Sequence, residues 1–85
     1  MAIEAKVHEV ACEHAPEIVL SLDFSGSVLQ LHSANLELAE VTAAKGQSAM
    51  GLDKCQDWVG RRVKVWFHLK QGEKYFGEIT RLYFY

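Results

Sequence analysis

The chain has 85 residues, of which 49% are hydrophobic, 24% are charged and 11% are aromatic, and its formal net charge is −2. This length predicts one domain, residues 1–85, and the composition is that of a globular protein and not of a disordered one. No run reaches the roughly 18 apolar residues that span a bilayer, and residues 1–6 lack the pattern of an export signal. We expect no membrane association and a cytoplasmic location, or an exported one if this is a domain cut from a longer chain.

The two parts of the chain differ in charge. Residues 1–53 contain two Lys or Arg and eight Asp or Glu, which gives −6, whereas residues 54–85 contain seven and three, which gives +4. A weakly acidic total argues against nonspecific binding of polyanions, but the basic part could still form a local patch. Two explanations stay open, a charge-complementary fold, which we favour, and a polyanion site.

Three strands are expected in the first 33 residues. Residues 3–10 alternate loosely, and residues 17–24 alternate more regularly between apolar and polar side chains. The apolar face of the second strand comprises Ile18, Leu20, Leu22 and Phe24. Ser25 and Gly26 then predict a tight turn into residues 27–33, so the second and third strands form a hairpin.

The middle of the chain is ambiguous. Residues 35–45 are rich in Ala and Glu, which favours a helix, yet part of the segment alternates, and we favour a strand near residues 36–41. Residues 47–50 indicate a loop. Residues 52–58 fit a short helix that ends at Gly60. Leu52, Cys55 and Val59 share one face of it at helical spacing.

The clearest pattern lies in residues 57–69 and 74–84, which predict two paired strands at the end of the chain. Alternation gives a buried face of Val63, Val65, Phe67 and Leu69. The opposite, solvent face is a row of Arg62, Lys64, Trp66 and His68, which we call the basic-aromatic row. In the last strand the apolar positions change parity, which predicts a bulge near Thr80 and Arg81.

The element order is strand, strand, strand, helix, strand, strand. This order predicts an all-β fold with one short helix, a five- to six-stranded OB-like Greek-key barrel. An SH3-like barrel is the alternative.

Several short sequence marks are spread over nearly the whole chain. They are residues 7–12 (Val-His-Glu-Val-Ala-Cys), residues 28–33, Cys55 shortly before residues 60–65 (Gly-Arg-Arg-Val-Lys-Val), and Gly77-Glu78-Ile79 with Leu82 and Phe84. In these marks the chain resembles an uncharacterised small bacterial OB-like barrel domain that is often appended to tetratricopeptide-repeat proteins. The resemblance implies an accessory, protein-interacting role, no catalytic residues, and proximity of Cys12 and Cys55. This chain shows no helical repeats, so its partner is not implied.

The two cysteines, Cys12 and Cys55, either form one disulfide or stay buried thiols. A disulfide over this separation would stabilise the fold by roughly 4 kcal/mol in the chain-entropy model, and export would favour it whereas a cytoplasmic location would keep it reduced. His8, Glu9 and Cys12 are similar to a His-Glu-x-x-His zinc motif, but residues four apart on a strand lie about 13 Å from each other. We predict no metal site and no cofactor.

No catalytic signature is present in the sequence. Gly-x-Ser-x-Gly, the phosphate-binding Gly-x-x-x-x-Gly-Lys and Cys-x-x-Cys are all absent. We therefore expect that the protein is not an enzyme.

The C-terminal hairpin carries the candidate binding surface. Its residues are Arg62, Lys64, Trp66, His68, Lys74, Arg81, Tyr83 and Tyr85, with Lys70 as a further extension. Basic and aromatic side chains together suit single-stranded nucleic acid, but a covered or partner-facing strand also explains them, and we favour this second explanation. The terminal aromatics also suit strand pairing, including self-association through the last strand. We favour a non-enzymatic protein-interaction or accessory module with an unknown protein partner, and single-stranded nucleic-acid binding is the alternative.

Overall fold

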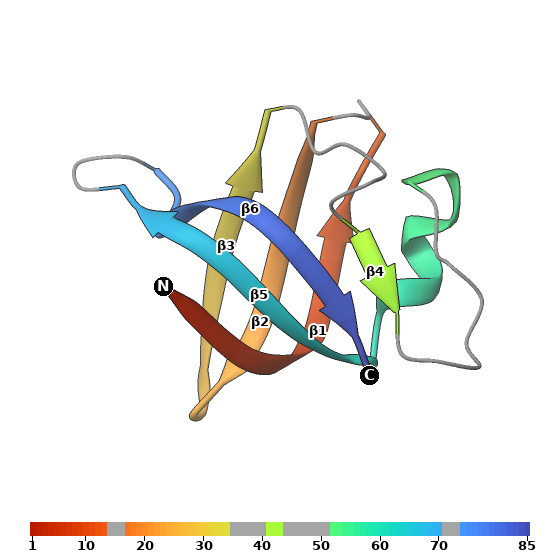
Figure 1. The fold of residues 1–85 in the computed structure, drawn as a ribbon, viewed down its shortest axis with the longest axis horizontal. Helices are drawn as coiled ribbons and strands as arrows, with labels where there is room; N and C mark the ends of the chain where they lie inside the picture. The colour runs from red at the N-terminus through yellow and green to blue at the C-terminus, as the bar shows by residue number, and fades with distance from the viewer. Residues whose placement is uncertain (14–16, 35–40, 44–51, 71–73) are drawn as a thin grey trace.

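The structure is a computed structural model that describes residues 1–13, 17–34, 41–43, 52–70 and 74–85 (Figure 1). Its elements are β1 (Ala2–Ala11), β2 (Ile18–Phe24), β3 (Ser27–Ser33), β4 (Val41–Ala43), the 3₁₀ helix η2 (Leu52–Trp58), β5 (Arg62–Leu69) and β6 (Gly77–Phe84). The first three strands, the short helix and the final hairpin therefore lie where the sequence predicts them. The strand expected near residues 36–41 meets β4 only at Val41, and its other residues, like the loop at 47–50, lie outside the described residues.

Five of the described strands close into a barrel. β1 pairs antiparallel with both β2 and β5, β2 pairs with β3, and β5 pairs with β6. A short parallel pairing between β3 and β6 closes the ring, and β4 lies parallel to the end of β6. The protein is thus an all-β, OB-like barrel with almost no helix, as the order of elements predicts.

Strand β1 pairs with two neighbouring strands along different parts of its length, which explains its loose alternation. Its first half pairs with β5 and its second half pairs with β2, with Lys6 matched on both sides. The register shifts between Val7 and Glu9, as in a β-bulge. Because the bulge reverses the parity of the strand, Val7 and Val10 are both buried although they are three positions apart.

The core is filled from all five barrel strands and from η2. Its largest side chains are Ile18, Leu20, Leu22, Leu31, Trp58, Phe67, Leu82 and Phe84. In β6 the predicted bulge is confirmed, since Trp66 pairs with Arg81 and Phe67 pairs with Ile79, which leaves Thr80 as the extra residue. This bulge lets Ile79 and Leu82 both face the core.

Three apolar residues expected in the core lie at its margin instead. Phe24 is 38% exposed because it closes the β2–β3 turn beyond the barrel wall. Leu69 is 49% exposed because it ends β5 opposite Gly77, which has no side chain to cover it. Val59 is exposed because a 3₁₀ helix has three residues per turn, which aligns Cys55 with Trp58 on the buried face.

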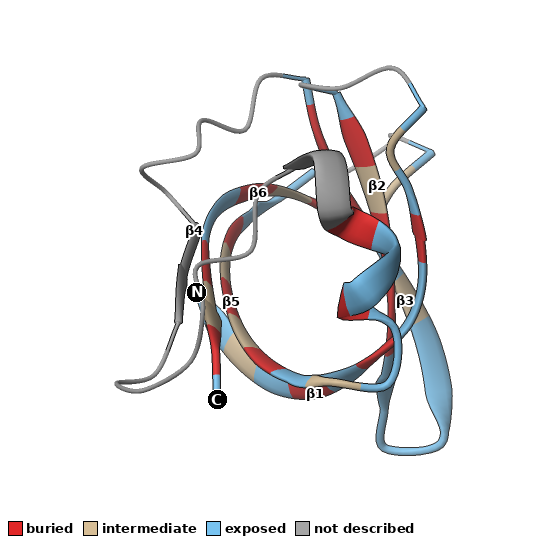
Figure 2. Cartoon of the chain, turned by 90° about the vertical axis from the view of Figure 1, so that its right-hand side faces the viewer, coloured by how far each residue is buried: buried red, intermediate tan, exposed pale blue. Residues whose placement is uncertain are grey.

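Helix η2 lies across one end of the ring of strands (Figure 2). The Trp58 ring is fully buried there, with its centroid 5.1 Å from that of Phe84. Gly60 ends the helix with a φ of +87°, as the sequence predicts, and its amide donates a hydrogen bond to the Val7 carbonyl. The helix is therefore fixed to β1 by backbone as well as by side chains.

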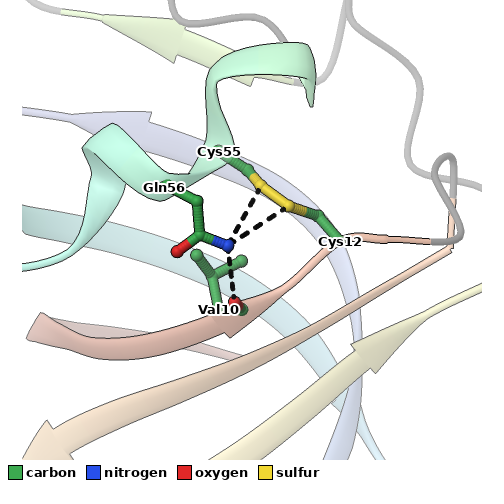
Figure 3. The surroundings of a disulfide bond; sticks show 4 residues. All are labelled: Val10, Cys12, Cys55 and Gln56. Carbon is green, nitrogen blue, oxygen red and sulfur yellow. Dashed lines mark hydrogen bonds between the residues drawn. A yellow bond between two sulfur atoms is a disulfide. The ribbon is translucent and has the colours of Figure 1, made fainter.

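A disulfide joins the end of β1 to η2 (Figure 3). Of the two alternatives open from the sequence, the structure has Cys12 bonded to Cys55, with their Cα atoms 6.7 Å apart, inside the usual range. The Gln56 side chain lies beside both sulfur atoms, and its Nε2 donates to the Val10 carbonyl at 3.4 Å. Covalent and polar contacts thus hold the same junction.

Replacing Phe67 with Ala should lower the free energy of unfolding by about 3 to 5 kcal/mol, because this ring is almost fully buried. Trp66→Ala, one position along on the outer face, should cost only about 1 kcal/mol. Urea unfolding of both variants measures the difference. A larger loss for Trp66→Ala would contradict the register of β5.

Breaking the disulfide should lower the free energy of unfolding by about 4 kcal/mol, because 43 residues of sequence separation give the oxidised unfolded chain a long closed loop. Urea unfolding with and without reductant measures this difference. The double variant Cys12→Ala and Cys55→Ala is the control and should not respond to reductant. Equal midpoints for the native chain under both conditions would contradict the prediction.

Candidate binding surfaces

The basic-aromatic row lies on the outer face of β5, between β1 and β6, as predicted. Arg62 and His68 are exposed, whereas Lys64 and Trp66 are half-buried. The Lys64 ammonium lies 5.1 Å from the centroid of the Trp66 ring, and the Arg81 guanidinium lies 5.0 Å from it. The π system of Trp66 is therefore already engaged by two cations of its own chain.

Tyr83 and Tyr85 extend this face toward its acidic neighbour on β1. Their rings meet edge to face at 5.2 Å, and the Tyr85 hydroxyl donates a hydrogen bond to the Glu4 carboxylate. This hydrogen bond favours the neutral phenol and so raises the pKa of Tyr85 above its ordinary value. The Tyr85 amide also donates to the Arg62 carbonyl at 3.3 Å, which ties the last residue to β5.

Lys74 lies apart from the row, at the other end of the hairpin. Its ammonium is 5.6 Å from the centroid of the Tyr75 ring, and that ring stacks on His32 of β3 at 5.0 Å with an interplanar angle of 11°. Nearby, Lys70 forms an ion pair with Glu78 at 3.1 Å. The structure thus divides the predicted site residues between two surfaces.

The second surface is a groove that the sequence analysis did not identify. It lies between β3 and the end of the β5–β6 hairpin and has a volume of about 640 Å³. Its lining residues are Val28, Leu29, Gln30, Leu69, Lys70, Lys74, Tyr75 and Phe76. We call it the hairpin groove. The sequence contained one signal of this groove, because alternation places the apolar residue Val28 on the predicted solvent face of its strand.

Three large apolar side chains are exposed in the hairpin groove. Val28 is 51% exposed, Leu69 is 49% exposed and Phe76 is 45% exposed. Lys70 and Lys74 flank them, and none of the described lining residues is acidic. The groove therefore combines an apolar floor with a positively charged rim.

One side of the groove is the edge of β3, which is only partly paired. β3 meets β6 through Leu31 opposite Gly77 and His32 opposite Glu78. Just before this pairing, the Phe76 amide donates to the Gln30 carbonyl at 2.9 Å. Within the described part of the chain, residues 27–29 have no strand beside them on this edge.

No group of three or more His, Cys, Asp or Glu side chains in the described residues could hold a metal ion. In the same residues, no helix is long and apolar enough to cross a membrane.

Gly77 positions the hairpin against β3, and Gly77→Ala should lower the free energy of unfolding by about 1 to 3 kcal/mol. An added Cβ would lie 2.6 Å from the His68 carbonyl oxygen and 2.7 Å from a ring carbon of Phe67, so the backbone would have to move. Urea unfolding measures the loss. An unchanged urea midpoint would contradict the close packing around Gly77.

Comparison of the chain with protein-family models, with curated proteins and with solved structures gave no match. The resemblance to the accessory barrel domain of tetratricopeptide-repeat proteins stays a prediction, and the candidate surfaces have to be interpreted from their own chemistry.

Proposed function

We propose that this protein is a non-enzymatic protein-interaction module whose contact surface is the hairpin groove. The observation that carries the proposal is the gathering of Val28, Leu69 and Phe76, each about half exposed, in one groove. Covering each of these side chains would contribute on the order of 1 kcal/mol. Exposed apolar clusters with a polar rim are typical of protein-binding sites.

Single-stranded nucleic acid is the competing ligand, because OB-type barrels bind oligonucleotides on the face of their second and third strands and at the loops beside it. Base stacking needs free aromatic faces. Here the Trp66 ring is already in contact with the cationic groups of Lys64 and Arg81. The Tyr75 ring stacks on His32 and also contacts the Lys74 ammonium. The net charge of −2 also opposes a phosphate-dominated interaction. These features support a protein ligand over a nucleic acid.

The test is selection of binders from a displayed library of random peptides, followed by affinity measurements with the enriched peptides. Val28→Ser should weaken their binding about tenfold, because it removes half-exposed apolar surface from the groove. Val59→Ser is the matched control, since Val59 is 46% exposed and does not line the groove. Fluorescence polarisation of labelled peptides measures both variants.

A second arm titrates single-stranded DNA and RNA at low and moderate salt while amide shifts are followed by NMR. Equal peptide binding by Val28→Ser and Val59→Ser, or failure to enrich any peptide, would contradict the proposal. Salt-sensitive shifts at Lys64, Trp66 and Arg81 would favour the nucleic-acid alternative instead.

A further inference from the structure

We infer that the edge of β3 that faces the hairpin groove accepts an extended, acidic peptide segment as an added β-strand. This inference rests on the proposed function and specifies its partner class.

The backbone of β3 presents N–H and C=O groups to the groove that have no partner strand among the described residues. Ser25 and Gly26 have φ values of +51° and +81°, as a two-residue type I′ turn requires, and Phe24 pairs with Ser27 across it. Hydrogen bonding to β2 then alternates along β3, so that Val28 and Gln30 direct their N–H and C=O groups away from β2. The bond from the Phe76 amide to the Gln30 carbonyl confirms this phase.

The Val28 amide and carbonyl are therefore directed at the groove, with no strand beside them among the described residues. Natural proteins protect such edges with charges, prolines, bulges or covering segments. Residues 27–30 are Ser-Val-Leu-Gln and contain neither a charge nor a proline, and their pairing with β2 shows no register shift. The edge thus has the properties of a strand-addition site.

The side chains suit a strand in this position. A segment added beside β3 would lie between this strand and the end of the hairpin, which together line the groove. Alternate residues of an extended chain point to opposite faces. The set on the same face as Val28 would cover this side chain, and apolar residues at every second position of the segment would match it.

The charge of the groove selects an acidic partner. Lys70 and Lys74 line it, and none of the described lining residues is acidic. Lys70 is ion-paired with Glu78 beside the groove at 3.1 Å, so Lys74 is the main source of the positive charge. A second copy of this chain pairing through the same edge would bring two sets of these lysines together, which disfavours a symmetric dimer. Glutamate or aspartate between the apolar positions of a peptide would instead be attracted.

The probe is a capped eight-residue peptide in which valine alternates with glutamate, titrated into the oxidised full chain and followed by amide NMR. Methylation of single peptide nitrogens should weaken binding about tenfold at alternate positions only, because every second amide donates to β3. The Val28 amide should exchange more slowly with solvent when the peptide is bound. Replacing glutamate by lysine in the peptide should also weaken binding about tenfold.

Two variants test whether a lysine in the groove attracts the peptide more than a lysine elsewhere on the molecule does. Lys74→Gln should weaken binding of the glutamate peptide, whereas Lys6→Gln, on β1 outside the groove, should not. Equal tolerance of N-methylation at every position would overturn strand addition, as would failure of this peptide to bind. If library-selected peptides still bound through Val28, the proposed function would stand without this inference. A dimer that forms through Val28 without peptide would overturn the assignment to an acidic peptide.

Discussion

The barrel depends on the short parallel pairing between β3 and β6. Two matched positions, Leu31 with Gly77 and His32 with Glu78, close the ring between the three-stranded β1–β2–β3 unit and the β5–β6 hairpin, which β1 and β5 already join on the other side. Only a residue without a side chain fits at Gly77, because Phe67, the His68 carbonyl and Leu31 occupy the space around it. Since the pairing is so short, it closes the barrel and at the same time leaves one edge of the start of β3 without a neighbouring strand among the described residues.

The opposite end of the barrel is held by different means. Helix η2 places Trp58 against Phe84, and the Cys12–Cys55 disulfide and the Gly60 amide attach the helix to β1. An 85-residue chain buries a modest fraction of its surface, so a covalent link adds appreciably to its stability. The molecule therefore combines a fixed end with an end whose strand edge is partly open.

Much of the fold could be predicted because period-2 alternation is strong in β2, β3 and β5. The parity change in β6 even located the bulge at Thr80. The bulge in β1 gave a weaker signal, since two consecutive polar residues, His8 and Glu9, occupy the positions where the parity changes. Phe24, Val59 and Leu69 were assigned to the core because alternation and helical spacing do not show where an element passes the barrel's end.

The candidate sites were predictable to different degrees. Alternation placed Arg62, Lys64, Trp66 and His68 on one face, but sequence could not show that Lys64 and Arg81 already occupy the Trp66 ring. The hairpin groove depends on tertiary proximity of β3 to residues some 40 positions later, such as Leu69 and Phe76. Its exposed Val28 was a local signal, yet a single exposed valine is common and carries little weight by itself.

The position of the disulfide in the chain also bears on how the barrel assembles. β1 and β5 are neighbours in the sheet but are separated by most of the chain, so their pairing requires closure of a long loop. Cys12 follows the end of β1 and Cys55 precedes β5, so the bond shortens the covalent path between these strands to a fraction of its length. In the oxidised chain the most distant strand pairing becomes comparatively local, which lowers the entropic barrier to folding.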